Sequence, residues 1–230
     1  MKNFKKMKMK FNLTNRRVKT MRIGLAAIAL AIATMGAQAQ TEKHTDPNAT
    51  AGAKALFNND FKSAITHFQK ATTTSASDPN VFYLLGVSQY QLGEYKNSVP
   101  NFTKAIALDA NLFNAYYHRA KANNLLAVNR ENKTADAERE SLLKSAIADY
   151  SKAIALKPDV AVLYQNRAIA YRDLGVLTGT AGTANYNKKT ATDAYNAAIE
   201  DYKKVLSLDA SRKDIQTEMK KATVYRDNLK

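Results

Sequence analysis

Apolar and polar residues follow a helical spacing in the segment 82–105, and the same spacing recurs on both sides of it. Gly52 stands 34 residues before Gly86, and Phe68 stands 34 residues before Phe102. A period of about this length, made of two amphipathic helices, is typical of an α-helical repeat array. One such pair cannot bury its apolar face alone, so the pattern predicts a stack of repeats that stabilise one another.

Two positions of the repeat hold residues of a defined size. The eighth position is always small, and the twenty-fourth is always a large aromatic ring. Small residues let two helices approach closely, and a ring fills the remaining space, because protein interiors have little spare volume. The small residues are Gly52, Gly86, Ala120 and Ala168, and the rings are Phe68, Phe102, Tyr150 and Tyr202.

With these residues at these offsets, most of residues 48–210 resembles the tetratricopeptide-repeat (TPR) family. The resemblance implies an all-α, right-handed α-solenoid of about four helix–turn–helix repeats, closed by a C-terminal capping helix. Asp46 followed by Pro47 predicts the first helix start. We expect a linker at 40–50, a TPR array at 51–210 and a capping helix at 211–230; the repeats span about 46–78, 79–111, 112–159 and 160–210.

The third and fourth repeats are longer than 34 residues. About 14 residues are inserted at 129–142 and about 18 at 176–193, in each case between the first and the second helix. The third insertion favours a helix from Thr134 onward, which predicts a lengthened second helix at 134–156. The fourth insertion is rich in Gly and Thr and predicts a flexible loop. Both should project from the same edge of the solenoid, next to each other.

Residues 1–39 have a different character. They contain nine basic residues and no acidic residue, then a short apolar run and the sequence Ala37-Gln38-Ala39. This order is typical of a secretory signal peptide. We therefore expect an exported protein, periplasmic or secreted, without a stable membrane span after cleavage. The alternative is an uncleaved amphipathic or anchoring segment.

The signal peptide also changes the meaning of the net charge. The whole chain has 35 basic and 20 acidic residues, a net charge of +15. Without the nine basic residues of the first 39, residues 40–230 keep 26 basic and 20 acidic residues, hence +6. A mild charge spread over interleaved acids and bases is typical of a solvated surface. Nucleic acid is therefore not an expected partner. A nucleic-acid or anionic-surface binder stays an alternative only if the basic residues gather on one face.

Little in the sequence indicates catalysis. The chain contains no cysteine, and its histidines, His44, His67 and His118, lie far apart. We predict no enzyme activity, no catalytic residue, no cofactor and no metal site. His118 falls on the inner side of the repeat, where it is expected to be a surface histidine or a ligand contact. An enzyme would need a polar cluster within the two insertions.

In the TPR family the first helices line a concave groove that binds peptides. The family offsets place eight candidate contacts on this chain: Tyr83, Val87, Tyr90, Tyr117, Lys121, Asn124, Gln165 and Arg172. The resemblance thus implies a non-catalytic scaffold for a protein or peptide partner. The family's clamp for a chaperone's C-terminal carboxylate is not expected, since its positions hold Ala49, Ala53 and Leu84.

Two alternatives to this groove stay open. The tyrosines could instead cover the seams between helices. The protein could also be an accessory factor that binds an envelope complex through the inserted edge, 129–142 and 176–193.

Overall fold

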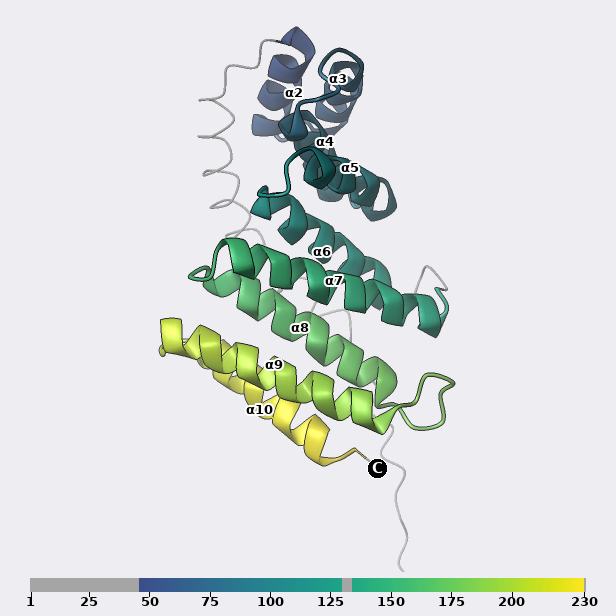
Figure 1. Cartoon of the computed structure of the whole chain (residues 1–230), viewed down its shortest axis with the longest axis vertical. Helices are drawn as coiled ribbons and strands as arrows, with labels where there is room; N and C mark the ends of the chain where they lie inside the picture. Colours follow the sequence, from purple (N-terminus) through teal and green to yellow (C-terminus); the bar gives the residue numbers. More distant parts are fainter. Residues whose placement is uncertain (1–45, 130–133, 230) are drawn as a thin grey trace, which may run out of the picture. The chain divides into compact units, whose positions relative to one another are not determined.

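A computed structural model describes residues 46–129 and 134–229, and all of the regular structure in these two ranges is α-helical (Figure 1). The predicted signal peptide and His44 lie outside the described residues. The described helices are α2 (Pro47–Phe57), α3 (Phe61–Thr74), α4 (Pro79–Gln91), α5 (Tyr95–Leu108), α6 (Phe113–Val128), α7 (Asp136–Leu156), α8 (Ala161–Thr178), α9 (Lys188–Leu208) and α10 (Lys213–Asp227).

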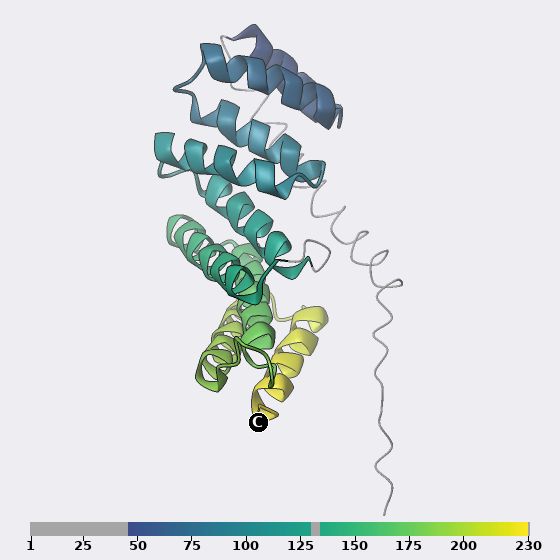
Figure 2. The same ribbon diagram turned by 90° about the vertical axis from the view of Figure 1, so that its right-hand side faces the viewer.

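The described helices stack in the order of the sequence, each in contact with the one before it (Figures 1 and 2). Four helix pairs form the four predicted repeats: α2 with α3, α4 with α5, α6 with α7, and α8 with α9. The helix α10 packs on α9 and α8 and buries Ile215 and Ala222 there. The all-α solenoid of four repeats and a capping helix is therefore confirmed.

Aspartate caps begin the first helix of the first two repeats. The Asp46 carboxylate accepts hydrogen bonds from the backbone N–H groups of Asn48 and Ala49, at 2.7 and 3.1 Å. Asp78 accepts in the same way from the N–H of Asn80, at 2.8 Å. The helix α2 thus starts at Pro47, as the Asp–Pro pair predicts. The predicted linker, 40–50, is too long, since residues 47–50 belong to α2.

The small residues and rings of the repeat pack against each other within each repeat. A methyl group added at Gly86 would lie only 2.7 Å from the Phe102 ring, and one at Gly52 would lie 2.9 Å from Phe68. All four rings at the twenty-fourth position are at most 1% exposed. Glycine at the eighth position is therefore required by close packing in the first two repeats.

The insertions extend the helices of the third and fourth repeats. The helices α6 to α9 have 16 to 21 residues, whereas α2 to α5 have 11 to 14. The helix predicted at 134–156 is observed at Asp136–Leu156. The predicted flexible loop at 176–193 is wrong in extent, because α8 continues to Thr178 and α9 begins at Lys188. Only 179–187 lies between them, and Gly182 there has a φ of 85°, which favours glycine.

The lengthened helices add a core layer of their own. Ala127, Leu143, Leu174, Leu177 and Ala194 are buried together, and they come from all four long helices. Leu177 lies within the fourth insertion, and the other four residues directly flank an insertion or lie close to one. An apolar face therefore continues from the repeat helices toward the inserted segments. None of the described helices combines the length and apolar character that a membrane crossing requires.

Candidate functional site

The first helices of successive repeats meet along one side of the stack. The helix α2 contacts α4, α4 contacts α6, α6 contacts α8, and α8 contacts α10. We call this side the inner face. All eight residues that the sequence predicts as groove contacts belong to α4, α6 or α8.

Two tyrosine rings flank one lysine on the inner face, where α4 and α6 meet. The Nζ atom of Lys121 lies 5.2 Å from the centre of the Tyr90 ring and 5.3 Å from that of Tyr117. Both distances are within the range of cation–π attraction. The three side chains are half-buried, so each keeps surface for a ligand. We call Tyr90, Tyr117, Lys121 and the adjoining His118 the aromatic–lysine cluster.

Lys121 has no countercharge in the described part of the chain. No salt bridge joins it to a carboxylate of residues 46–129 or 134–229, and its recorded neighbours are aromatic. Burial lowers the pKa of its ammonium group, because the rings and helices around it exclude water. A partly desolvated cation without an anion favours an incoming hydrogen-bond acceptor.

The expectation that His118 is a surface histidine or a ligand contact is wrong, because its side chain is only 7% exposed. Burial and the nearby Lys121 lower its pKa to about 3, so the imidazole is neutral at neutral pH. Its Nδ1 atom lies 2.9 Å from the carbonyl oxygen of Asn114, which suits an Nδ1–H donor. Four rings surround it at centre distances of 5.0 to 6.0 Å: Tyr83, Tyr90, Phe102 and Tyr117.

Tyr83 and Val87 are corrected as groove contacts. They are 5% and 3% exposed, so neither offers its side chain to a ligand. Tyr83 packs against Phe102, with ring centres 6.1 Å apart. Tyr83 thus covers the seam between helices, which is the alternative that the sequence left open for the tyrosines. The side chains of Tyr83 and Val87 both lie beneath the surface of the inner face and not on it.

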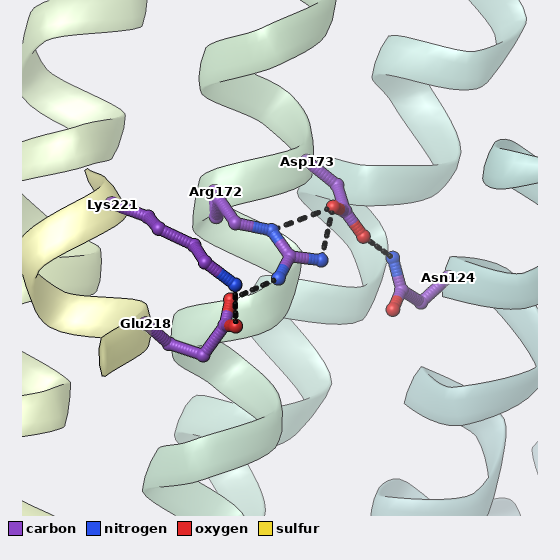
Figure 3. A network of polar contacts seen from close by, with 5 residues as sticks. All are labelled: Asn124, Arg172, Asp173, Glu218 and Lys221. Atoms are coloured by element: carbon purple, nitrogen blue, oxygen red, sulfur yellow. Dashed lines mark hydrogen bonds and ion pairs between the residues drawn. The ribbon is translucent and has the colours of Figure 1, made fainter. Parts of the chain in front are cut away.

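Further along the inner face, the charged groups bind one another (Figure 3). Arg172 pairs with Asp173 at 2.8 Å and with Glu218 at 3.1 Å. Lys221 pairs with Glu218 at 2.7 Å, and the Asn124 amide donates to Asp173 at 3.3 Å. We call these five residues the paired network. It links α6, α8 and α10. The side chains of Asn124 and Arg172, both predicted to contact a ligand, are therefore bonded to carboxylates of this chain.

Gln165 is separate from both groups. Its Oε1 atom accepts a hydrogen bond of 3.1 Å from Arg212, the residue before α10. Of the predicted contacts, the structure thus brings together Tyr90, Tyr117 and Lys121 at the surface.

A repeated ion pair on the helix seams was missed by the sequence reasoning. Arg119 donates two hydrogen bonds to Asp149, of 2.8 and 2.7 Å, and a third to Thr103 of the preceding repeat, of 3.0 Å. The signal was available, since the arginine and the aspartate occupy the seventh and the twenty-third repeat positions. The same arrangement recurs one repeat later with Arg167, Asp201 and Ser151.

The two insertions lie next to each other, as predicted. Asn185 of the fourth donates a hydrogen bond of 3.0 Å to Glu140 of the third. A pocket of about 280 Å³ beside them is lined in part by Asp136, Arg139 and Asp173. Both carboxylates are ion-paired, Asp136 with Arg139 at 2.7 Å and Asp173 within the paired network. In the described ranges, no group of three or more His, Asp or Glu side chains could hold a metal ion.

Comparison with known proteins agrees with this architecture. The tetratricopeptide repeat family model matches residues 79–112, which hold α4 and α5. No curated protein matches the sequence.

Several solved structures have a similar fold. The MamA RS-1 ArsTM double mutant is 19% identical, with a TM-score of 0.58 over 77% of this chain and 82% of that one. YrrB, described as "a TPR protein with an unusual peptide-binding site", is 18% identical, with a TM-score of 0.53 over 86% and 88% of the two chains. The described helices therefore define a TPR-type α-solenoid.

Proposed function

We propose that the protein is an exported, non-catalytic scaffold that binds a peptide segment of a partner protein on its inner face. The observation that carries the proposal is the aromatic–lysine cluster. Two half-buried tyrosine rings offer apolar area and hydroxyl groups, and Lys121 between them has no countercharge in the described ranges. Tyrosine and an unpaired cation suit a peptide, which carries both apolar groups and acceptors.

The inner face is favoured over the inserted edge for an electrostatic reason. The carboxylates beside the edge pocket are ion-paired within the chain, whereas Lys121 is not. An unpaired, partly desolvated group gains more from a ligand than a group whose partner must first be displaced. The edge remains the second candidate, because its pocket of about 280 Å³ is open beside α6, α7 and α8.

The test begins with a random peptide library displayed on phage and selected on the immobilised full chain. The affinity of one selected peptide is then measured for Tyr90→Ala and Tyr117→Ala. Each should bind at least about tenfold more weakly, since truncating a buried aromatic anchor removes 1.4 kcal/mol or more. Circular dichroism should show both variants folded.

Tyr186→Ala is the matched control, because this exposed tyrosine lies in the loop of the inserted edge. It should bind as the wild type does. If Tyr186→Ala weakens binding and the two inner-face variants do not, the edge is the binding site and the proposal is wrong.

Export is proposed from residues 1–39 and is tested separately. The sequence Ala37-Gln38-Ala39 after a short apolar run favours cleavage near Gln40. N-terminal sequencing of the protein from the envelope or medium should then begin near Gln40. An intact Met1 or Met21 terminus in cytosolic material would contradict export.

A further inference from the structure

We propose that the aromatic–lysine cluster recognises one carboxylate of the bound peptide, with apolar peptide groups beside it. This inference rests on the proposed function and specifies the ligand of the same surface. It depends on three observations: the charge balance around Lys121, the hydrogen-bond state of the flanking tyrosines, and the neutrality of the paired network.

The charge balance around Lys121 calls for one negative charge. The titratable side chains recorded against it are Tyr90, Tyr117 and His118. Burial holds both tyrosines in the neutral phenol form and keeps His118 in the neutral imidazole form at neutral pH. The ammonium group of Lys121 is thus the only full charge in the cluster. A monoanion completes the pair, whereas a phosphate dianion would normally require several cations or a bidentate arginine.

The flanking tyrosines can donate hydrogen bonds to an acceptor. The Tyr117 hydroxyl oxygen accepts from the amide of Asn166 at 3.3 Å, which leaves its own hydrogen for a ligand. The Tyr90 hydroxyl has no hydrogen-bond partner among the described residues. The cluster therefore supplies an ammonium group and two hydroxyl donors, and an ionised carboxylate is a pure acceptor.

The rest of the inner face limits how many acidic groups the bound peptide can carry. The paired network contains two cations, Arg172 and Lys221, and two carboxylates, Asp173 and Glu218, in mutual contact. It adds no net charge, and a second acidic group placed there would meet carboxylates already bound. The surface thus favours a peptide with one acid among apolar residues over an acidic run. This differs from a clamp made of several cations.

The first experiment repeats the phage selection with Lys121→Met and Lys121→Glu. Methionine keeps an unbranched side chain that is one atom shorter than lysine, and it removes the charge. Wild-type protein should enrich Asp, Glu or a free C-terminus, Lys121→Met should lose this enrichment, and Lys121→Glu should enrich Lys and Arg instead. Equally acidic pools from wild type and Lys121→Met would overturn the carboxylate assignment.

Lys221→Met is the matched control. It removes a lysine from the same inner face, but one whose partner, Glu218, lies 2.7 Å away. Its selected pool should equal the wild-type pool. A loss of acidic peptides with this variant as great as with Lys121→Met would also overturn the assignment.

Synthetic peptides then locate the carboxylate. One peptide replaces its acidic residue by the amide (Asp→Asn or Glu→Gln), and another has an amidated C-terminus. Removing the recognised carboxylate should weaken binding about tenfold, and the loss should vanish on Lys121→Met, because the two changes remove one interaction. If neither peptide binds more weakly, the assignment is wrong.

The outcomes separate this inference from the proposed function. If Tyr90→Ala and Tyr117→Ala select the same peptides as the wild type, the inner face is not the binding site. The other outcome is that these variants select no peptides and that the pool selected on the wild type shows no preference for acidic residues. In that case the inner face binds a peptide and only the carboxylate assignment is wrong.

Discussion

Lys121 and Arg172 stand on neighbouring first helices, α6 and α8, and both were predicted to line one groove. Their surroundings differ. Arg172 is held by Asp173 and Glu218, and Asp173 is also bound by Asn124. Lys121 lies between two tyrosine rings, and no carboxylate of the described residues pairs with it. The repeat offset thus predicts which residues lie on the inner face. Whether a cation there stabilises the fold or is available to a ligand depends on whether the chain supplies it with a carboxylate partner.

The largest expected effect concerns the paired network. Asp173→Ala should lower the free energy of unfolding by about 2 kcal/mol, because it leaves the part-buried Arg172 with one carboxylate and the Asn124 amide without its acceptor. Urea denaturation measures the change. Asp193→Ala, which breaks an exposed pair with Lys189, should leave stability unchanged. Equal losses for the two variants would mean that the network contributes no more than a surface pair.

A second prediction concerns the charge state beside Lys121. The folded pKa of His118 is about 3, below its ordinary value of 6.5. The unfolded chain therefore takes up a proton first as the pH falls below 6.5, and stability is lost from there toward pH 3. Between pH 7.5 and 5.5 the wild type should lose about 1.4 kcal/mol more than His118→Phe.

Chemical denaturation at both pH values measures this difference. The other two histidines remain in both proteins, so the difference isolates His118. Identical pH dependence would show that His118 titrates normally. The cluster would then carry a second charge near pH 6, and Lys121 would not be its only cation.

The smallest effect is expected at the inserted edge. Deleting residues 181–184 shortens the loop between α8 and α9, whose ends are already joined by a backbone hydrogen bond of 2.7 Å from Asn187 to Thr178. Stability should change by less than about 1 kcal/mol, since the entropy of loop closure varies slowly with length.

Peptide capture by this deletion variant should equal that of the wild type, as measured with the selected peptide. The deletion removes Thr183, which lines the edge pocket, and therefore tests the edge directly. Lost capture by a folded variant would favour the edge over the inner face.

The solenoid could be predicted because the residues that pack its helices together recur at a fixed spacing in the sequence. The spacing of Gly86 and Phe102 recurs along the chain, and that pair is in contact in the fold. The extent of the fourth insertion could not be predicted from its turn residues. Glycine and threonine at 178–183 indicate a break, but the buried Leu177 before it and Ala191 after it keep the flanks helical.

The binding surface was predictable in part. A residue's offset in the repeat indicates toward which side of the stack its side chain points, but not how much of that side chain is exposed. Tyr83 and Tyr90 are both inward tyrosines of α4, yet Tyr83 is buried against Phe102 and His118 while Tyr90 is only partly buried. The ion-pair partners of Arg172 could also not be predicted from the repeat offsets. Glu218 lies 46 residues further along the chain, in a capping helix that no groove offset covers.

The most direct test compares the two cations with one selected peptide. Lys121→Met should weaken binding at least about tenfold and leave the free energy of unfolding unchanged. Arg172→Met should change binding less than about twofold and lower the free energy of unfolding. If a folded Arg172→Met weakens binding as much as Lys121→Met does, the countercharges do not distinguish a structural cation from a binding cation on the inner face.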